Sequence, residues 1–188
     1  MNKCNHPNIV KLIGISYINL ELKYLIMEYM NMGDLRSYLI NIRSHYNNNN
    51  NNLELFLNIL IQISNGCLYL EDNKIVHRDL AARNCLLNKD NNNLIVKISD
   101  LGLARNIYTN EIYEIKNKRP LPLRWMAPES IFDAFFTSKS DVWSFGILMS
   151  EIFNYGAQPY SGLLNDEIRL ALKNKRMPHP PDKCPNEM

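Results

Sequence analysis

Paired cysteines are absent from the sequence. Its four cysteines, Cys4, Cys67, Cys85 and Cys184, stand far apart and show no Cys-x-x-Cys spacing. This distribution indicates neither a zinc cluster nor a disulfide framework. A reducing, intracellular setting fits such cysteine usage best.

An excess of one charge sign is also absent. The chain has 21 basic and 19 acidic residues and a formal net charge of +2. Such a balance gives no reason to expect a nucleic-acid partner or a polybasic membrane anchor. Partners must therefore be inferred from specific sites.

Long hydrophobic runs are missing as well. The richest apolar stretch, 53–63, contains Glu54, Asn58 and Gln62, and it is shorter than the ~20 apolar residues of a membrane span. Met1 is followed by no apolar run and no cleavage pattern, so no signal peptide is expected in this chain. If the protein is a receptor, its export signal and membrane segment are expected upstream.

What is present is the composition of a folded protein. Hydrophobic residues make up 46% and charged residues 21% of the 188 residues, which is typical of a globular chain that buries one sizeable core. We therefore expect one domain, or one large piece of a domain.

The hydrophobic pattern predicts strands first and helices later. Residues 9–18 and 24–28 are β-branched and apolar, which predicts two strands joined by a polar turn. A short helix is predicted over 35–42, and the asparagine run 47–52 is expected to be a solvated loop. Short strands are predicted at 74–77 and 94–99.

Two longer helices are expected. One covers 53–70, and we assign to its buried face the residues Leu53, Leu57, Leu60, Ile61, Ser64 and Leu68. The other covers 142–153, begins with a capping box at Ser138-x-x-Asp141, and is apolar almost all round, so we expect it to be buried. The polar segment 106–119 lacks periodicity and is predicted to be a functional loop.

Three motifs follow one another in a fixed order. They are His77-Arg78-Asp79-Leu80-Ala81-Ala82-Arg83-Asn84, then Asp100-Leu101-Gly102, then Ala127-Pro128-Glu129 with Asp141-Val142-Trp143-Ser144-Phe145-Gly146. Over essentially its whole length the chain resembles the protein kinase family, and the match in the first motif is specific. Any single Asp or Asn among them would more often be a turn or capping residue; together they favour a catalytic site.

The chemistry of phosphoryl transfer explains why these residue types are needed. The reaction requires a positioned hydroxyl nucleophile and a divalent metal that neutralises the triphosphate. The resemblance makes Asp79 the candidate catalytic base and Asn84 and Asp100 the candidate ligands of Mg²⁺, or of Mn²⁺. His77 could be a base because imidazole titrates near neutrality, but we favour a structural role beneath the metal-binding motif.

The resemblance assigns further structural roles. Asp141 is expected to accept hydrogen bonds from the catalytic-loop backbone, and Arg78 to contact a phosphorylated activation loop. Leu101 replaces the usual Phe of the Asp-Phe-Gly motif, which is expected to alter the balance between active and inactive loop positions. Glu129 is expected to lack an arginine partner that the family supplies further downstream.

Tyrosine specificity is implied by two local resemblances. Ala81 stands where serine/threonine kinases carry Lys, and Arg83 belongs to the Ala-Ala-Arg-Asn arrangement of receptor tyrosine kinases. Pro122, Arg124 and Trp125 match the platform that admits a tyrosine ring.

The ATP site is placed by resemblance alone. The 28–30 segment, Glu28-Tyr29-Met30, would present backbone groups to adenine, with Met27 as gatekeeper and Leu86 as floor. Asp34 would lie at the ribose mouth, and Asp100 would face the phosphates. Taken singly, Met27 and Leu86 are ordinary core residues.

The segment 106–113 resembles the activation loop of the insulin-receptor superfamily. Tyr108 and Tyr113 match two of its three tyrosines, and Ile112 replaces the other. Phosphorylation there would add about −1.5 to −2 charge and could order the loop. The closest resemblance is to the Sevenless/Ros class, with anaplastic lymphoma kinase and insulin receptor as alternatives.

The expectation is therefore an incomplete α+β, protein kinase-like fold. Residues 1–30 would be a remnant of the small lobe, and 31–188 the large lobe, truncated before its last helices. No Gly-rich loop, strand Lys or helix Glu is found, so this chain alone is expected to bind ATP weakly and turn over little.

The expected function is transfer of the γ-phosphate of ATP to tyrosine in protein substrates. The protein would be a single-pass receptor with its kinase on the cytoplasmic side of the plasma membrane, and it would self-associate and trans-phosphorylate. A pseudokinase or docking module, and a serine/threonine kinase, are the alternatives.

Overall fold

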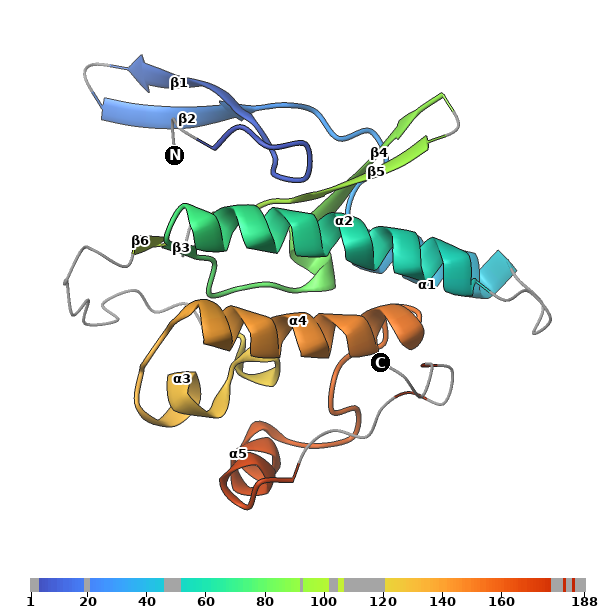
Figure 1. Cartoon of the computed structure of the whole chain (residues 1–188), viewed down its shortest axis with the longest axis vertical. Coiled ribbons are helices and arrows are strands. Elements are labelled where there is room, and N and C mark those ends of the chain that lie inside the picture. The colour runs from blue at the N-terminus through green and yellow to red at the C-terminus, as the bar shows by residue number, and fades with distance from the viewer. Residues whose placement is uncertain are drawn as a thin grey trace.

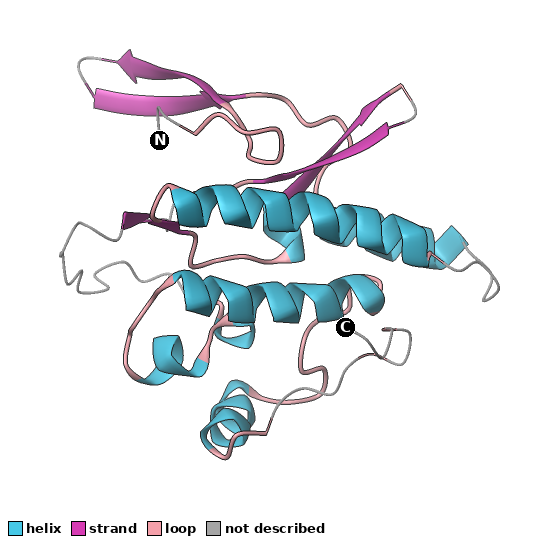
Figure 2. Cartoon of the chain, viewed as in Figure 1, coloured by secondary structure: helices cyan, strands magenta, loops and turns pink. Residues whose placement is uncertain are grey.

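Strands and helices form separate layers in the computed structural model of the chain (Figures 1 and 2). The structure describes residues 4–18, 21–45, 52–91, 93–101, 105–106, 121–176, 181 and 184. Two hairpins lie on one side of the long helix α2, and α4 lies on its other side, followed by α3 and α5. This arrangement puts the functional loops between the two sides.

The strands of the described residues pair as three antiparallel two-stranded sheets. Their bounds are β1 Leu12–Ile18 with β2 Glu21–Met27, β3 Ile75–Val76 with β6 Arg105–Asn106, and β4 Cys85–Asp90 with β5 Asn93–Ile98. The strands expected in 9–18, 24–28, 74–77 and 94–99 are present. Strand β4 was not predicted.

Backbone hydrogen bonds join the segment before β1 to β5. Val10 N donates to Ile98 O over 2.9 Å, and Ile98 N donates to Asn8 O over 2.8 Å. Beyond β2, Leu87 N donates to Gly33 O over 2.8 Å. The segment 28–34 is thereby held against β4, close to the residues that follow the catalytic motif.

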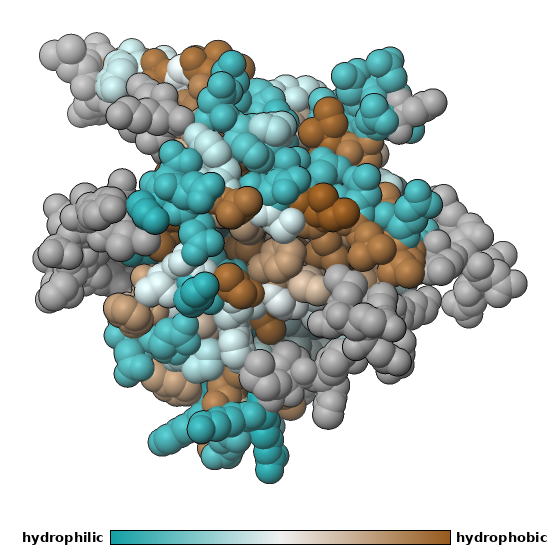
Figure 3. All heavy atoms as spheres, viewed as in Figure 1, coloured by the Kyte–Doolittle hydropathy of each residue, from teal (hydrophilic) through white to brown (hydrophobic). Residues whose placement is uncertain are grey.

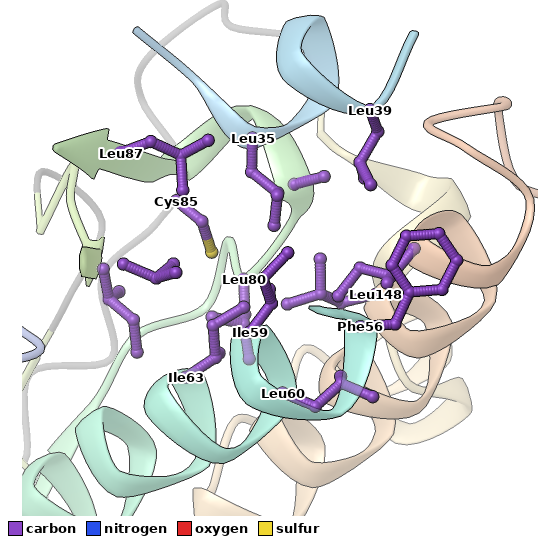
Figure 4. Packing of buried hydrophobic residues seen from close by; sticks show 14 of the residues in the cluster. Leu35, Leu39, Phe56, Ile59, Leu60, Ile63, Leu80, Cys85, Leu87 and Leu148 are labelled. Atoms are coloured by element: carbon purple, nitrogen blue, oxygen red, sulfur yellow. The ribbon is translucent and has the colours of Figure 1, made fainter. Parts of the chain in front are cut away.

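The helices supply the rest of the scaffold. They are α1 Leu35–His45, α2 Leu53–Asp72, α3 Pro128–Phe132, α4 Ser138–Phe153 and α5 Asn165–Lys173, with 3₁₀ turns η1 Ala82–Asn84 and η2 Leu123–Trp125. Figure 4 shows the main core, in which α1, α2, β4 and α4 direct apolar side chains toward one another.

The predicted buried face of α2 was wrong for most of its residues, because the face that packs into the core is rotated about the helix axis relative to the prediction. Ile61 is 60% and Leu68 57% exposed, whereas the buried residues are Phe56, Ile59, Leu60, Ile63, Gly66 and Leu70. Apolar residues occupy so many positions of this helix that periodicity alone did not separate its faces. Figure 3 shows hydrophobic spheres across the middle of the surface, at the height of α2 in Figure 1.

By length and composition α2 could cross a membrane, because its mean hydropathy is 1.4 over a window with few charges. In this fold its buried side packs into the main core. The helix expected at 53–70 thus contributes to the core, although other apolar residues on it, such as Ile61 and Leu68, are exposed.

The start of α4 differs from the predicted capping box. Thr137 is the N-cap and its Oγ1 accepts from Lys139 N over 3.2 Å, while Ser140 Oγ accepts from Thr137 N over 3.0 Å. Because Thr137 caps the helix, the Asp141 carboxylate is not used as a cap. The helix was expected to be buried; much of it is, but Val142 is 59% exposed, so one side of α4 reaches the surface.

Gly66 lies where α2 packs tightly against β5. A Cβ at this position would lie 2.8 Å from Ile98 Cδ1 and 2.9 Å from the Asn8 backbone oxygen. Gly66→Ala should therefore lower the free energy of unfolding by roughly 1–2 kcal/mol, because overpacking outweighs the gain in helix propensity.

A matched control is available for this substitution. Gly146, in α4, has open space around its Cβ position, so Gly146→Ala should stabilise the protein by about 0.5–1 kcal/mol. Urea unfolding of both variants measures the difference. Equal shifts would contradict the close packing described at Gly66.

Candidate active site

The loop that carries the first motif is anchored to α4 by Asp141. Its Oδ2 accepts from His77 N over 2.6 Å and its Oδ1 from Arg78 N over 3.0 Å. Burial raises the pKa of Asp141, and the two backbone hydrogen bonds oppose that rise. The predicted contact between Asp141 and the catalytic-loop backbone is therefore present.

His77 is buried and uses both ring nitrogens inside the fold. Nδ1 accepts from Asp79 N over 3.2 Å, so Nε2 carries the proton and donates to Ser99 O over 2.9 Å. The imidazole thus connects the Asp79 loop to the segment that leads to Asp100. This geometry fits the structural role that we favoured over a role as catalytic base.

Asp79 lies at the centre of a polar cluster. Asn84 Nδ2 donates to the Asp79 backbone oxygen over 2.7 Å and to its Oδ2 over 2.8 Å, and Arg83 forms an ion pair with Oδ1. Burial raises the pKa of the Asp79 carboxyl, the charge of Arg83 and the Asn84 hydrogen bond lower it, and the Asp100 charge raises it. The net shift is upward.

Asp100 is brought to this cluster by the end of β5. Ser99 donates from both N and Oγ to Asn84 O, each over 2.8 Å, and the next residue is Asp100. Asp100 is exposed, and its φ of 55° lies in the left-handed region, a strained backbone that is often found at functional sites.

Asn84 and Asp100 fit a divalent ion that prefers oxygen. The Asn84 amide nitrogen is occupied by Asp79, which leaves its Oδ1 as the amide atom that can face a metal. Within the described ranges no cluster of three or more His, Cys, Asp or Glu could hold a metal. One carboxylate and one amide oxygen suit Mg²⁺, which keeps several waters and binds substrate phosphates.

The residues predicted to form the substrate platform lie in and next to η2. The Arg83 guanidinium carbon lies 4.2 Å from the centre of the Trp125 ring, within cation–π range. Arg124 donates to the backbone oxygens of Pro159 and Tyr160, each over 2.9 Å, and of Leu163 over 2.7 Å. Arg124 therefore holds the loop before α5, and Pro122 precedes the turn as its N-cap.

The segment predicted to bind adenine, 28–30, directly follows β2. The Glu28 carboxylate bonds Lys97 Nζ through both oxygens, each over 2.8 Å, and accepts from Lys11 N over 2.6 Å. Burial acts to raise the pKa of Glu28, but the Lys97 and Lys11 interactions outweigh it, so this pKa is lowered. Met27 is 48% exposed and Met30 is buried.

Asp34 and Leu86 are neighbours through a bridge between their backbones. The Asp34 carboxylate also caps α1, because it accepts from Ser37 N over 2.9 Å and from Ser37 Oγ over 2.7 Å. The structure thus places Asp34 beside Leu86, and it gives Asp34 a capping role that was not foreseen.

Comparison with known proteins decides the family. The model "Protein tyrosine and serine/threonine kinase" matches residues 1–188. The chain belongs to this protein kinase family. Its predicted resemblance and its α+β kinase fold are thereby confirmed.

Several receptor tyrosine kinases and one viral relative are similar to this kinase. It is 44% identical to the transforming protein ros of UR2 avian sarcoma virus and 45% identical to human ROS, in each case over all of this chain. It is 42% identical to sevenless of Drosophila virilis, again over its whole length. The chain spans 48% of the viral protein, 8% of human ROS and 7% of sevenless.

Some predicted sites of the kinase stay predictions. Tyr108 and Tyr113 lie outside the described residues. Arg78 stacks over Phe136, 4.9 Å from the ring centre, and Leu101 packs partly buried against the main core. No ion pair of Glu129 occurs in the part of the chain that the structure describes.

One buried residue of the site was missed. Glu151 in α4 is only 1% exposed, and it bonds both the catalytic loop and the platform. The available signal was an acidic residue within the largely apolar second half of α4, since a buried carboxylate requires partners.

The pH profile of the kinase tests the environment of Asp79. As the predicted catalytic base, Asp79 has to be unprotonated to accept a proton, so on this prediction kcat/KM should fall on the acid side with a midpoint above the ordinary Asp value. Arg83→Met removes a charge that lowers the pKa of Asp79, so this acid limb should move to higher pH. A limb that moves to lower pH in the variant would contradict the described ion pair.

Proposed function

We propose that this chain is the catalytic part of a protein that transfers the γ-phosphate of ATP to tyrosine hydroxyls of protein substrates, with Mg²⁺ or Mn²⁺ as the metal. The observation that carries the proposal is the cluster at Asp79. Its carboxylate is fixed by Arg83 and Asn84 and senses the charge of Asp100.

Each residue of the cluster has a distinct role in this reaction. Asp79 orients the substrate hydroxyl and takes its proton, and Arg83 and Asn84 hold the Asp79 carboxylate in place. Asn84 Oδ1 and Asp100 would hold the metal, which when bound neutralises charge on the triphosphate. Because the protein forms no bond to phosphorus, positioning and electrostatics supply the catalysis.

Tyrosine specificity is supported by the contact between Arg83 and Trp125. Arg83 connects the base to the platform, since it pairs with Asp79 on one side and covers the Trp125 ring on the other. A substrate hydroxyl that reaches Asp79 must therefore pass beside this pair. The phenol of tyrosine supplies the required length and a ring that packs against the platform.

The setting of the whole protein is proposed from its relatives. One relative, 45% identical, is named a tyrosine-protein kinase transmembrane receptor, Ror of Drosophila melanogaster. We infer that this kinase acts on the cytoplasmic side of the plasma membrane within a single-pass receptor that self-associates. Tyr108 and Tyr113 are the proposed sites of trans-phosphorylation.

An assay with the full-length protein tests this function. With Mg-ATP it should label a tyrosine peptide, and should leave unlabelled the same peptide with Phe in place of Tyr. Absence of turnover would favour a pseudokinase, and stronger labelling of a serine peptide would identify a serine/threonine kinase.

A further inference from the structure

Glu151 is positioned between two functional segments. Its Oε2 accepts from the Ala82 backbone N over 3.0 Å and from the Trp125 indole Nε1 over 2.7 Å. Ala82 lies in the catalytic loop, and Trp125 ends η2 on the substrate platform. One oxygen of a helix side chain thus fixes both segments relative to α4.

The other carboxylate oxygen of Glu151, Oε1, indicates that a glutamate here does not serve stability alone. Glu151 is 1% exposed, and among the described residues no hydrogen bond reaches its Oε1. Burying a carboxylate with one oxygen unsatisfied costs free energy. Burial also raises the pKa of Glu151, against the hydrogen bonds and the charges of Arg83 and Arg36.

The contacts continue from Glu151 to the catalytic base. The Trp125 ring, held at its Nε1 by Glu151, lies under the Arg83 guanidinium, and Arg83 pairs with Asp79 Oδ1. The Trp125 backbone oxygen is held separately by Ser144 Oγ over 2.7 Å. The orientation of the indole therefore depends on Glu151, while the course of its backbone does not.

We propose that Glu151 is a positioning residue that sets the orientation of the Trp125 ring and, through Arg83, the orientation of the Asp79 carboxylate. The inference rests on the proposed phosphoryl transfer. The essential feature is an acceptor at Oε2, so Gln should replace Glu at this position and Met should not.

Kinetics of the full-length protein test the positioning role. Glu151→Met should lower kcat about 10- to 100-fold, as expected for a misplaced catalytic group, with the KM for ATP changed less than about twofold. Glu151→Gln can place its amide oxygen where the Glu151 Oε2 accepts, and should keep kcat within about threefold of the parent. Glu71→Met, at an exposed position near the end of α2, is the matched control and should leave both constants unchanged.

A purely structural role would give a different pattern. In that case Glu151→Met would lower the melting temperature, while kcat per folded enzyme, from active-site titration, would stay at the parental value. That result would overturn the proposal. If Glu151→Met does not fold, Trp125→Phe, which removes the Nε1 donor and keeps an aromatic ring, should show the same loss of kcat; full activity in this variant would also overturn it.

A spectroscopic measurement separates this inference from the proposed function. In protein labelled with ¹⁵N-tryptophan, the Trp125 indole N–H signal, assigned by its loss in Trp125→Phe, should be protected from solvent exchange and shifted by its bond to Glu151. Glu151→Met should abolish the shift and protection, and Glu151→Gln should keep most of both. An unchanged Trp125 signal in Glu151→Met would refute the contact even if the parent protein proves inactive.

Discussion

Asp79→Asn in the full-length protein should lower kcat by about 10²- to 10⁴-fold, which is the usual contribution of a general base. Asparagine keeps the size of the side chain and can still accept from Asn84 Nδ2, whose bond to Oδ2 is 2.8 Å long. It cannot take the proton of a substrate hydroxyl. Initial rates with Mg-ATP and a tyrosine peptide measure the loss.

The control for this substitution is Asp72→Asn, at an exposed position at the end of α2. It removes the same charge from the chain and should leave kcat unchanged. If Asp79→Asn retained parental turnover while folding normally, Asp79 would not be the base.

Asp141→Ala should lower the free energy of unfolding by roughly 2–4 kcal/mol, because it leaves two backbone N–H groups of the catalytic loop without their acceptor. These are the His77 and Arg78 groups, held at 2.6 and 3.0 Å. Since this loop carries Asp79, kcat should fall as well. Urea unfolding and initial rates measure the two effects.

A graded variant separates the two hydrogen bonds. Asp141→Asn keeps one carbonyl acceptor, so its loss of stability should be about half that of Asp141→Ala. An alanine variant as stable as the parent would show that the catalytic loop does not depend on α4 for its anchor.

The strands and helices could be predicted where the pattern of polar and apolar residues was compatible with only one kind of secondary structure. The hairpin of β1 and β2 followed from β-branched residues on either side of a polar turn. Strand β4 was missed because Cys85–Asp90 followed a recognisable motif and were considered only as its continuation. Its pairing with β5 is local in the sequence, since Asp90 faces Asn93, whereas its hydrogen bond with Gly33 joins residues far apart in the sequence.

Helix phase and side-chain competition limited the other predictions. In α2 apolar residues occur on nearly every side of the helix, so the sequence pattern did not show that Ile61 and Leu68 are exposed. Asp34 was placed at the ribose mouth by resemblance, and its capping bonds with Ser37 were not foreseen because sequence alone did not show them. Glu151 was missed because its partners, Ala82 and Trp125, become its neighbours only in the folded chain.

The catalytic motif was predictable for a physical reason. Asp79, Arg83 and Asn84 lie within one short segment, so a single turn, η1, suffices to bring their side chains together. Asp100 is distant in the sequence, and the hydrogen bonds from Ser99 to the Asn84 backbone oxygen bring it to the same site.

The central claim is that Asp79, Asn84 and Asp100 share one magnesium-bound nucleotide. A crystal structure of the kinase domain of the full-length protein, with magnesium and a non-hydrolysable ATP analogue, tests it most directly. Asn84 Oδ1 and an Asp100 carboxylate oxygen should each lie about 2.0–2.1 Å from one magnesium ion, with the Asp79 carboxylate facing the terminal phosphate. A magnesium ion held by other side chains, or a nucleotide bound away from these three residues, would contradict it.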